Sequence, residues 1–231
     1  MVPRELVSNV FSFLHRPIRV GFVGHRPNRL PDESVERVRA ALESACDSIE
    51  AAGKEAATRT ISFILSCGLA EGADRIAAEV ALARGWTLEA PLPFSIERYE
   101  QDFATPDSVA AFQTLLKQAA KVRPLPQNDE RPELAYLAAG LLAIKTADLA
   151  LVVWDGAPGA GPGGTPDIAA RALDIGMPVI WVGVAERQRS KLILPDAGKA
   201  RKGERAIYLR GALAARFEKT ERPAALRAGP G

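Results

Sequence analysis

Short apolar runs alternate with segments of helical periodicity along most of this chain. The apolar runs are 18–24, 60–66, 86–93, 147–155 and 178–183, with a weaker one at 121–126. Helical patterns fill the intervals, at 32–52, 70–85, 95–103, 108–120, 131–146 and 166–175. Because the strands are apolar throughout rather than every second residue, they are typical of a parallel sheet buried on both faces. The pattern therefore predicts an α/β fold of three layers, with a mainly parallel sheet between two layers of helices.

The length of 231 residues fits one domain of this class. We expect a single α/β domain over 18–217, preceded by an N-terminal extension (1–17) and followed by a loose C-terminal tail (218–231). The end of the domain carries two expected edge strands, "KLILP" (191–195) and "AIYLR" (206–210), and an expected closing helix, "ALAARFEK" (212–219).

Charge, cysteine content and the lengths of the apolar runs argue against several classes of protein. Thirty Lys and Arg against 28 Asp and Glu give a net charge of +2, without the basic excess typical of a nucleic-acid-binding surface. The two cysteines and two histidines do not have zinc-ligand spacing, so we expect no metal and no resident cofactor. No apolar run approaches the roughly 18 residues of a membrane span, and we expect a cytoplasmic protein without a membrane partner.

Ligands of open α/β sheets bind beyond the carboxyl ends of the strands, so the loops that follow the strands are the candidate sites. The first such loop contains Gly24, His25 and Arg26. Glycine permits close backbone approach, and a guanidinium group suits a phosphate because its planar fork matches the oxyanion. A plain turn with solvated arginines explains the same residues equally well.

The second loop, "SCGLAEGAD", leads from a strand into a helix and contains Ser66, Gly68, Glu71, Gly72 and Asp74. Helix N–H groups exposed there favour a ligand, but the two carboxylates repel anions and suit ribose hydroxyls or a base amine better. Acids in a first helical turn also complement the helix dipole, so a purely structural role stays open. Cys67 is interpreted as a small packing residue rather than an activated thiol.

The third loop follows the most apolar strand. It starts at Asp155, contains glycines 156, 159, 161, 163 and 164, and enters a helix at Thr165. Backbone without side chains can wrap an anion, and Thr165 can cap the helix or bind a phosphate oxygen. The loop lacks the Gly-Lys-Ser/Thr ending of a Walker A motif and does not fit a G-x-G-x-x-G fingerprint. Loop flexibility is the alternative explanation of the glycines.

Taken in order, these motifs resemble one known group of proteins. "GHR", "SCGLAEGAD", "LPF" with a downstream "Y..DF", and "DLALVVWDG…GPGGT…GMPVIWV" are similar to the SLOG superfamily, which joins DNA-processing protein A and the LONELY GUY (lysine-decarboxylase-like) proteins. The resemblance extends from about residue 18 to residue 183. It implies a Rossmann-like fold that binds nucleotides or nucleotide-derived ligands, with Gly163, Gly164 and Thr165 at the phosphate and the loop 66–74 facing the rest of the ligand.

The chain departs from this resemblance where the hydrolytic members carry their catalytic Glu. Their Gly-Gly-x-Gly-Thr-x-x-Glu motif places it three residues after Thr, where this chain has Ile168. Asp167 is one residue short, and a helix turns about 100° per residue, so its carboxylate is expected to point elsewhere. A hydrolase needs a correctly placed carboxylate. The candidates here are Glu71, Asp74, Asp155 and Asp167, of which none is a firm assignment.

Three functions follow from these observations. The first is a sensor that binds a nucleotide-derived small molecule, in a bacterial defence or stress-signalling system, and acts through an effector partner or a homo-oligomer. The second is an N-glycosidic hydrolase resembling the phosphoribohydrolases. The third, least favoured, is an accessory protein for single-stranded DNA, which requires a basic groove. Tyr99, Asp102 and Phe103 either close over a base or simply pack, and Arg131 and Tyr136 are expected at the same rim.

Overall fold

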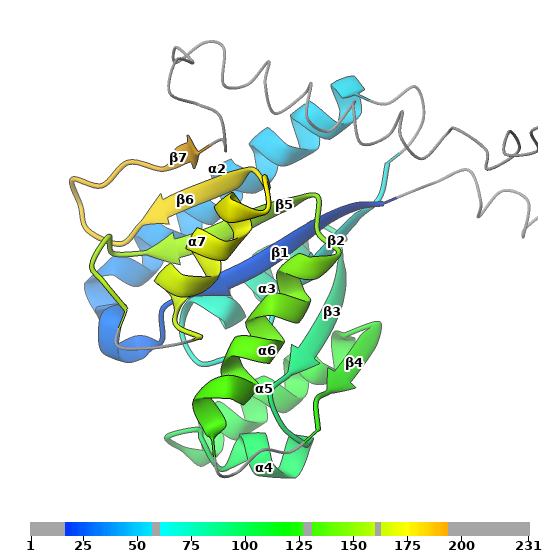
Figure 1. The fold of residues 1–231 in the computed structure, drawn as a ribbon, viewed down its shortest axis with the longest axis vertical. Helices are drawn as coiled ribbons and strands as arrows, with labels where there is room; N and C mark the ends of the chain where they lie inside the picture. Colours follow the sequence, from blue (N-terminus) through cyan, green and yellow to red (C-terminus); the bar gives the residue numbers. More distant parts are fainter. Residues whose placement is uncertain (1–16, 57–60, 127–130, 160–162, 194–231) are drawn as a thin grey trace, which may run out of the picture.

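The computed structural model describes residues 17–56, 61–126, 131–159 and 163–193. Within these ranges, seven strands form one sheet with the order β4-β3-β2-β1-β5-β6-β7 (Figure 1). Every neighbouring pair is parallel except β6 and β7, which are antiparallel. The mainly parallel sheet predicted from the sequence is confirmed. The strands are β1 (Ile18–Gly24), β2 (Phe63–Ser66), β3 (Thr87–Leu92), β4 (Lys121–Pro124), β5 (Leu149–Trp154), β6 (Val179–Gly183) and β7 (Lys191–Ile193).

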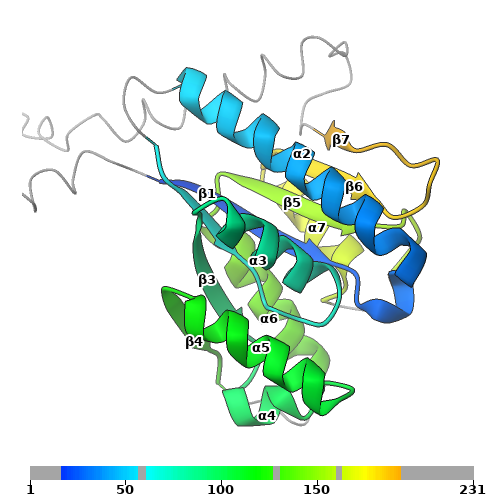
Figure 2. The same cartoon turned by 180° about the vertical axis from the view of Figure 1, so that it is seen from behind.

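Helices cover both faces of the sheet. Helices α6 and α7 lie over one face (Figure 1), and α2, α3 and α5 lie over the other (Figure 2). This is the predicted three-layer α/β/α arrangement, and the fold class is confirmed. The described helices are η1 (Pro27–Arg29, a 3-10 turn), α2 (Asp32–Ala56), α3 (Ala73–Ala83), α4 (Ile96–Glu100), α5 (Pro106–Gln118), α6 (Pro132–Lys145) and α7 (Thr165–Asp174).

Strand β5 shows why the central strands are apolar at every position. Its Leu149, Leu151 and Val153 pack in the apolar cluster on the α2 and α3 side. The residues between them, Ala150 and Val152, pack in a second cluster with α7. Successive side chains of a strand point to opposite faces, so a strand covered on both faces needs an apolar residue at each position.

Several element boundaries differ from the predictions by a few residues, and two of them involve glycine. The helix expected from residue 70 begins at Ala73, because Gly72 has φ +93° and the Ala73 N–H donates to the His25 carbonyl at 3.0 Å. The helix expected to end at residue 52 continues through Gly53 to Ala56. Gly53 packs closely on β1, where a Cβ would lie 2.6 Å from the Ile18 Cδ1.

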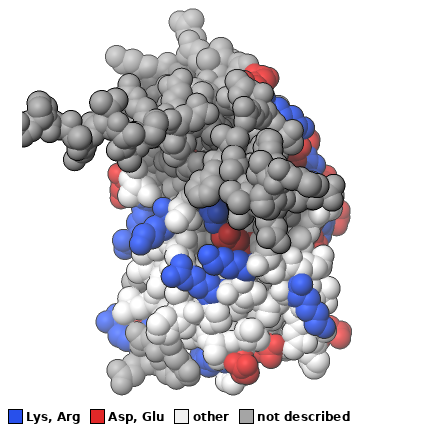
Figure 3. All heavy atoms as spheres, turned by 90° about the vertical axis from the view of Figure 1, so that its right-hand side faces the viewer, with Lys and Arg blue, Asp and Glu red and all other residues white. Residues whose placement is uncertain are grey.

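Several predicted features lie outside the described residues. They are nearly all of the extension 1–17, Gly161, the expected strand 206–210, the expected helix 212–219 and the tail 218–231. The domain limits 18–217 therefore stay a prediction. None of the described helices combines the length and apolar character that a membrane crossing needs. Viewed from the β4 side, the described surface carries both basic and acidic side chains (Figure 3).

Candidate functional site

The strand order creates a crevice at the carboxyl ends of β1 and β5. Strand β1 lies between β2 and β5, and the chain runs from β1 to β2 on one side but returns from β4 to β5 on the other. The loops after β1 and β5 therefore leave the sheet in opposite directions, which is the usual ligand position in doubly wound folds. Because β2, β1 and β5 are parallel neighbours, all three predicted loops meet at this edge.

A pocket of about 380 Å³ occupies this crevice. We call it the switch-point pocket. Its lining includes eight of the residues predicted from the sequence: Gly24, His25, Arg26, Gly68, Asp74, Gly163, Gly164 and Thr165. The other predicted site residues, Ser66, Glu71, Gly72, Asp155 and Asp167, do not line it.

Helix α6 supplies lining residues that the sequence analysis missed. Glu133 and Gly140 line the pocket, together with Tyr136, which was expected only at its rim. Their spacing of three and four residues places them on one helical face, so this periodicity was the available signal. The sequence did not reveal that this face, rather than another, is turned toward the loops.

The β1 loop is held by close backbone contacts with the start of α3. A Cβ on Gly72 would lie 2.6 Å from the His25 carbonyl oxygen, and one on Gly24 would lie 2.5 Å from the Ala73 Cβ. These glycines therefore allow the two loops to touch. The His25 ring is 4% exposed, and its burial lowers the pKa of His25, an effect that Asp155 offsets only in part. This shift favours the neutral form of the ring.

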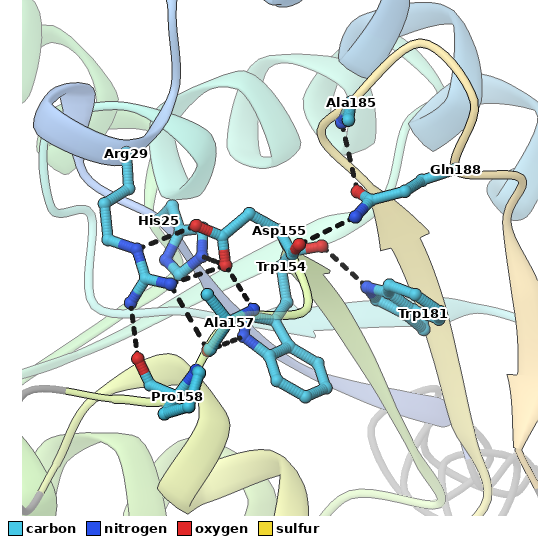
Figure 4. Close-up of polar contacts among 9 residues, drawn as sticks. All are labelled: His25, Arg29, Trp154, Asp155, Ala157, Pro158, Trp181, Ala185 and Gln188. Atoms are coloured by element: carbon cyan, nitrogen blue, oxygen red, sulfur yellow. Dashed lines mark hydrogen bonds and ion pairs between the residues drawn. The ribbon is translucent and has the colours of Figure 1, made fainter.

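Asp155 fastens the β5 loop to the β1 loop (Figure 4). Arg29 donates to both of its carboxylate oxygens, at 2.8 and 2.6 Å, and the Ala157 N–H donates at 2.9 Å. His25 Nε2 lies 3.0 Å from Asp155 Oδ1. Partial burial favours the neutral acid, but Ala157, Arg29 and His25 outweigh it and hold the pKa of Asp155 below its usual value. Asp155 thus positions the loops instead of facing the pocket.

Two tryptophans and a glutamine support the same loop from the β6 side (Figure 4). Trp181 Nε1 donates to the Trp154 carbonyl at 2.7 Å, and Trp154 Nε1 donates to the Ala157 carbonyl at 2.8 Å. Gln188 donates to the Asp155 carbonyl at 2.7 Å. These side-chain hydrogen bonds fix the backbone at the end of β5, before the glycine-rich segment begins.

Asp74 is the one acid of the predicted catalytic set that lines the pocket. It is 7% exposed, and its Oδ2 accepts the Ala70 N–H at 3.4 Å. Burial raises the pKa of Asp74 to about 7, although the N–H groups of Ala70, Gly24 and Gly68 and the charge of Arg26 act in the opposite direction. A carboxyl group with such a pKa changes its protonation near neutral pH, as a general acid or base must.

The other acids of that set are bonded elsewhere. Glu71 accepts hydrogen bonds from Ser108 Oγ and from the Ala104 N–H. Burial favours its neutral form, but these two bonds outweigh that effect, so the pKa of Glu71 lies below its usual value. Asp167 accepts the Gly163 N–H at 3.0 Å and pairs with Arg171 at 2.9 Å. Its carboxylate is directed to its own loop, as the sequence analysis expected.

Cys67 is a packing residue, as interpreted from the sequence. Its side chain is fully buried, and burial raises the pKa of its thiol well above the ordinary value. A thiol of this kind is a poor nucleophile because the reactive form is the thiolate.

The glycine-rich loop enters α7 against α6. Gly163 has φ +80°, and a Cβ there would lie 2.7 Å from the Leu137 amide nitrogen. Gly164 precedes the helix, and Thr165, its first residue, is buried at the pocket wall. The first N–H groups of an α-helix have no partner within the helix, so the start of α7 offers donors to an anion.

Aromatic and charged groups close the opposite wall. The Arg26 guanidinium lies 4.8 Å from the centre of the Tyr136 ring, whose hydroxyl donates to Asp102. Tyr99 also lines the pocket and is 1% exposed, and it packs against Phe103. Asp102 accepts the hydrogen bond from Tyr136, and Phe103 packs against Tyr99. Among the described residues, no group of three or more His, Cys, Asp and Glu is placed to hold a metal ion.

No protein-family model and no curated protein matches the chain. Two solved structures have a similar fold. The X-ray structure of DNA processing protein A from Streptococcus pneumoniae matches with a TM-score of 0.47 and 14% identity, over 74% of this chain and 52% of that chain. The X-ray structure of TM1055, a structural genomics target, matches with a TM-score of 0.42 and 15% identity, over 71% and 72% of the two chains.

This chain therefore spans about half the length of the DNA processing protein A chain that it matches.

Proposed function

We propose that this protein binds a nucleotide or nucleotide-derived ligand in the switch-point pocket and acts as a sensor. The observation that carries the proposal is the meeting of two kinds of group in one pocket. The start of α7 with Gly164 and Thr165 offers anion donors beside the close backbone turn at Gly163, and Asp74, in the first turn of α3, lines the same pocket. A phosphate suits the first group, and ribose hydroxyls or a base amine suit the second.

Sensing, rather than turnover, is supported by what the acids do. Glu71, Asp155 and Asp167 each accept hydrogen bonds that hold a loop in place. Their carboxylates are used to shape the pocket and are not directed at a ligand. A protein that binds a ligand without converting it must transmit the binding event to something else. The proposal therefore includes an effector partner or a change in the protein's own oligomeric state. Analytical ultracentrifugation with and without ligand tests whether ligand binding changes the oligomeric state.

Thermal unfolding tests the ligand class. The probes are nucleoside mono-, di- and triphosphates, cyclic nucleotides, NAD and ADP-ribose. A ligand at 100 times its Kd adds about 2.7 kcal/mol, which for a chain of this size raises Tm by roughly 5–10 °C. Thr165→Arg should remove the shift because it fills the phosphate position. Thr114→Arg is the matched control, since Thr114 is exposed on α5. No shift with any probe would overturn the proposal.

A second candidate function is N-glycosidic hydrolysis, and Asp74 favours it. It is the buried, pocket-facing carboxyl group with a pKa of about 7. Chromatography of each probe after incubation tests this reaction. Free base released by the wild type, but not by Asp74→Asn with binding retained, would assign the hydrolase. Intact probe recovered with a full thermal shift would assign the sensor.

A further inference from the structure

A second hollow lies on the α6 side of the sheet, away from the switch-point pocket. It encloses about 440 Å³ between the carboxyl half of α6 and strands β3 and β4. None of its lining residues lines the switch-point pocket. We call it the β4-side hollow. Its lining is Arg19, Ser66, Glu89, Ala90, Pro91, Lys121, Arg123, Leu142 and Thr146.

Strand register places the polar residues of this hollow on one face. Ser66 pairs with Gly21 on one side and with Glu89 on the other, and Glu89 pairs with Lys121. Paired residues of adjacent strands point to the same face, as do residues two apart in one strand, such as Lys121 and Arg123. A Cβ on Gly21 would lie 2.7 Å from the Ala143 carbonyl oxygen, so this face is the α6 face.

The hollow exists because α6 covers only part of that face. Helix α6 packs on β1 and β3, while β4 lies beyond it at the edge of the sheet (Figure 1). A small residue, Ser66, occupies the strand beneath, next to the space that Leu142 of α6 borders. A parallel sheet normally buries both faces under apolar residues, so the polar side chains mark this area as different.

The charges in the hollow do not cancel. Arg19 pairs with Glu89, and its Nε is buried with no hydrogen-bond partner in the described structure. Lys121 and Arg123 are exposed, and no ion pair or hydrogen bond joins either side chain to another described residue. Three cations and one carboxylate give a net charge of +2. The carboxyl end of α6 adds only about half a negative charge, so the cations prevail.

We propose that the β4-side hollow is a second ligand site, which binds the phosphoryl group of a small phosphorylated molecule. A phosphate dianion matches the net charge, and its oxygens accept hydrogen bonds from guanidinium, ammonium and hydroxyl groups. Ser66 and Thr146 supply the hydroxyls, and Leu142 gives the hollow an apolar wall. Figure 3, which views the molecule from the β4 side, shows Lys and Arg side chains close to an acidic side chain on this face. The proposal gives Ser66 a role that the switch-point pocket does not.

Isothermal titration with inorganic pyrophosphate tests the proposal. Because the switch-point pocket is also proposed to hold phosphate, the wild type should bind two ions. Lys121→Gln/Arg123→Gln should weaken one of them by at least about tenfold, since each lost charged hydrogen bond costs roughly a factor of ten. Lys117→Gln/Arg189→Gln, which changes the net charge equally at exposed positions elsewhere, should keep both. Thr165→Arg should remove only the other ion.

Glu89→Gln provides a test in the opposite direction. It removes the carboxylate that competes with the anion for Arg19, so pyrophosphate should bind this hollow at least about threefold more tightly. Ribose 5-phosphate is the second probe. Comparing its affinity with that of pyrophosphate shows whether the hollow prefers a phosphorylated organic molecule or a free inorganic anion. Equal weakening by the control pair, a wild type with no bound ion that Lys121→Gln/Arg123→Gln weakens, or no gain in Glu89→Gln would overturn the proposal. A wild type that binds one ion, weakened by Lys121→Gln/Arg123→Gln but not by Thr165→Arg, would support this site and count against phosphate in the switch-point pocket.

Discussion

Replacing Asp74 by Asn should change how stability depends on pH. The carboxyl group is buried at the wall of the switch-point pocket, and burial raises its pKa from 3.8 to about 7. The folded state therefore binds the proton more tightly than the unfolded chain. This contribution to stability is full below the unfolded pKa and is lost as the pH rises through the folded pKa. Asn keeps the size of the side chain and does not titrate.

The size of the effect follows from the shift in pKa. One unit corresponds to about 1.4 kcal/mol, so a shift of about three units is worth roughly 4 kcal/mol across the full titration. Between pH 5 and pH 8 the folded group loses most of its proton. The free energy of unfolding of the wild type should then fall by roughly 2–3 kcal/mol more than that of Asp74→Asn.

Urea unfolding at pH 5, 6, 7 and 8 measures this difference. Asp155→Asn is the informative control, because the pKa of Asp155 is lowered and not raised. Its carboxylate stabilises the fold fully above the unfolded pKa, and this contribution is lost only as the pH falls through the folded pKa, so between pH 5 and pH 8 this variant should be less stable than the wild type by a constant amount. Parallel curves for the wild type and Asp74→Asn, within about 0.5 kcal/mol, would refute the assignment of a buried, proton-binding Asp74.

Three further outcomes are expected. In a double-mutant cycle of Arg29→Gln and Asp155→Asn, the coupling should be about 1–2 kcal/mol, because the pair is bidentate and partly buried; additivity in urea unfolding would contradict this. Gly163→Ala should lower the free energy of unfolding by about 2 kcal/mol more than Gly176→Ala, since both have positive φ but only Gly163 also meets backbone within 3.0 Å. Cys67 should react with a thiol reagent only at the rate of unfolding, and fast labelling in the native state would be inconsistent with its burial.

The fold was predictable because its determinants are local. Each central strand is a run of apolar residues, and a glycine or a polar residue follows where the strand ends. The meeting of the three loops followed from the parallel order of β2, β1 and β5, without any knowledge of side-chain contacts. The position of the switch-point pocket was predictable on the same basis.

The roles of individual acids were not predictable, since their partners are distant in the sequence. Asp155 is bonded to Arg29, 126 residues away, and Glu71 to Ser108, 37 residues away. The local sequence around these carboxylates does not distinguish them from Asp74, whose side chain lines the pocket. Ser66 ends a predicted strand, but the face to which it points depends on where α6 packs. Such choices depend on tertiary contacts that short-range patterns do not contain.

A crystal structure with bound ligand tests the central claim most directly. The crystal would be soaked with whichever nucleotide probe gives the largest thermal shift. We predict a phosphate group at the start of α7, within about 3 Å of the Thr165 N–H and hydroxyl, with the rest of the ligand extending toward Asp74. A ligand bound outside the switch-point pocket, or one whose phosphate points away from Gly163 and Gly164, would contradict the account.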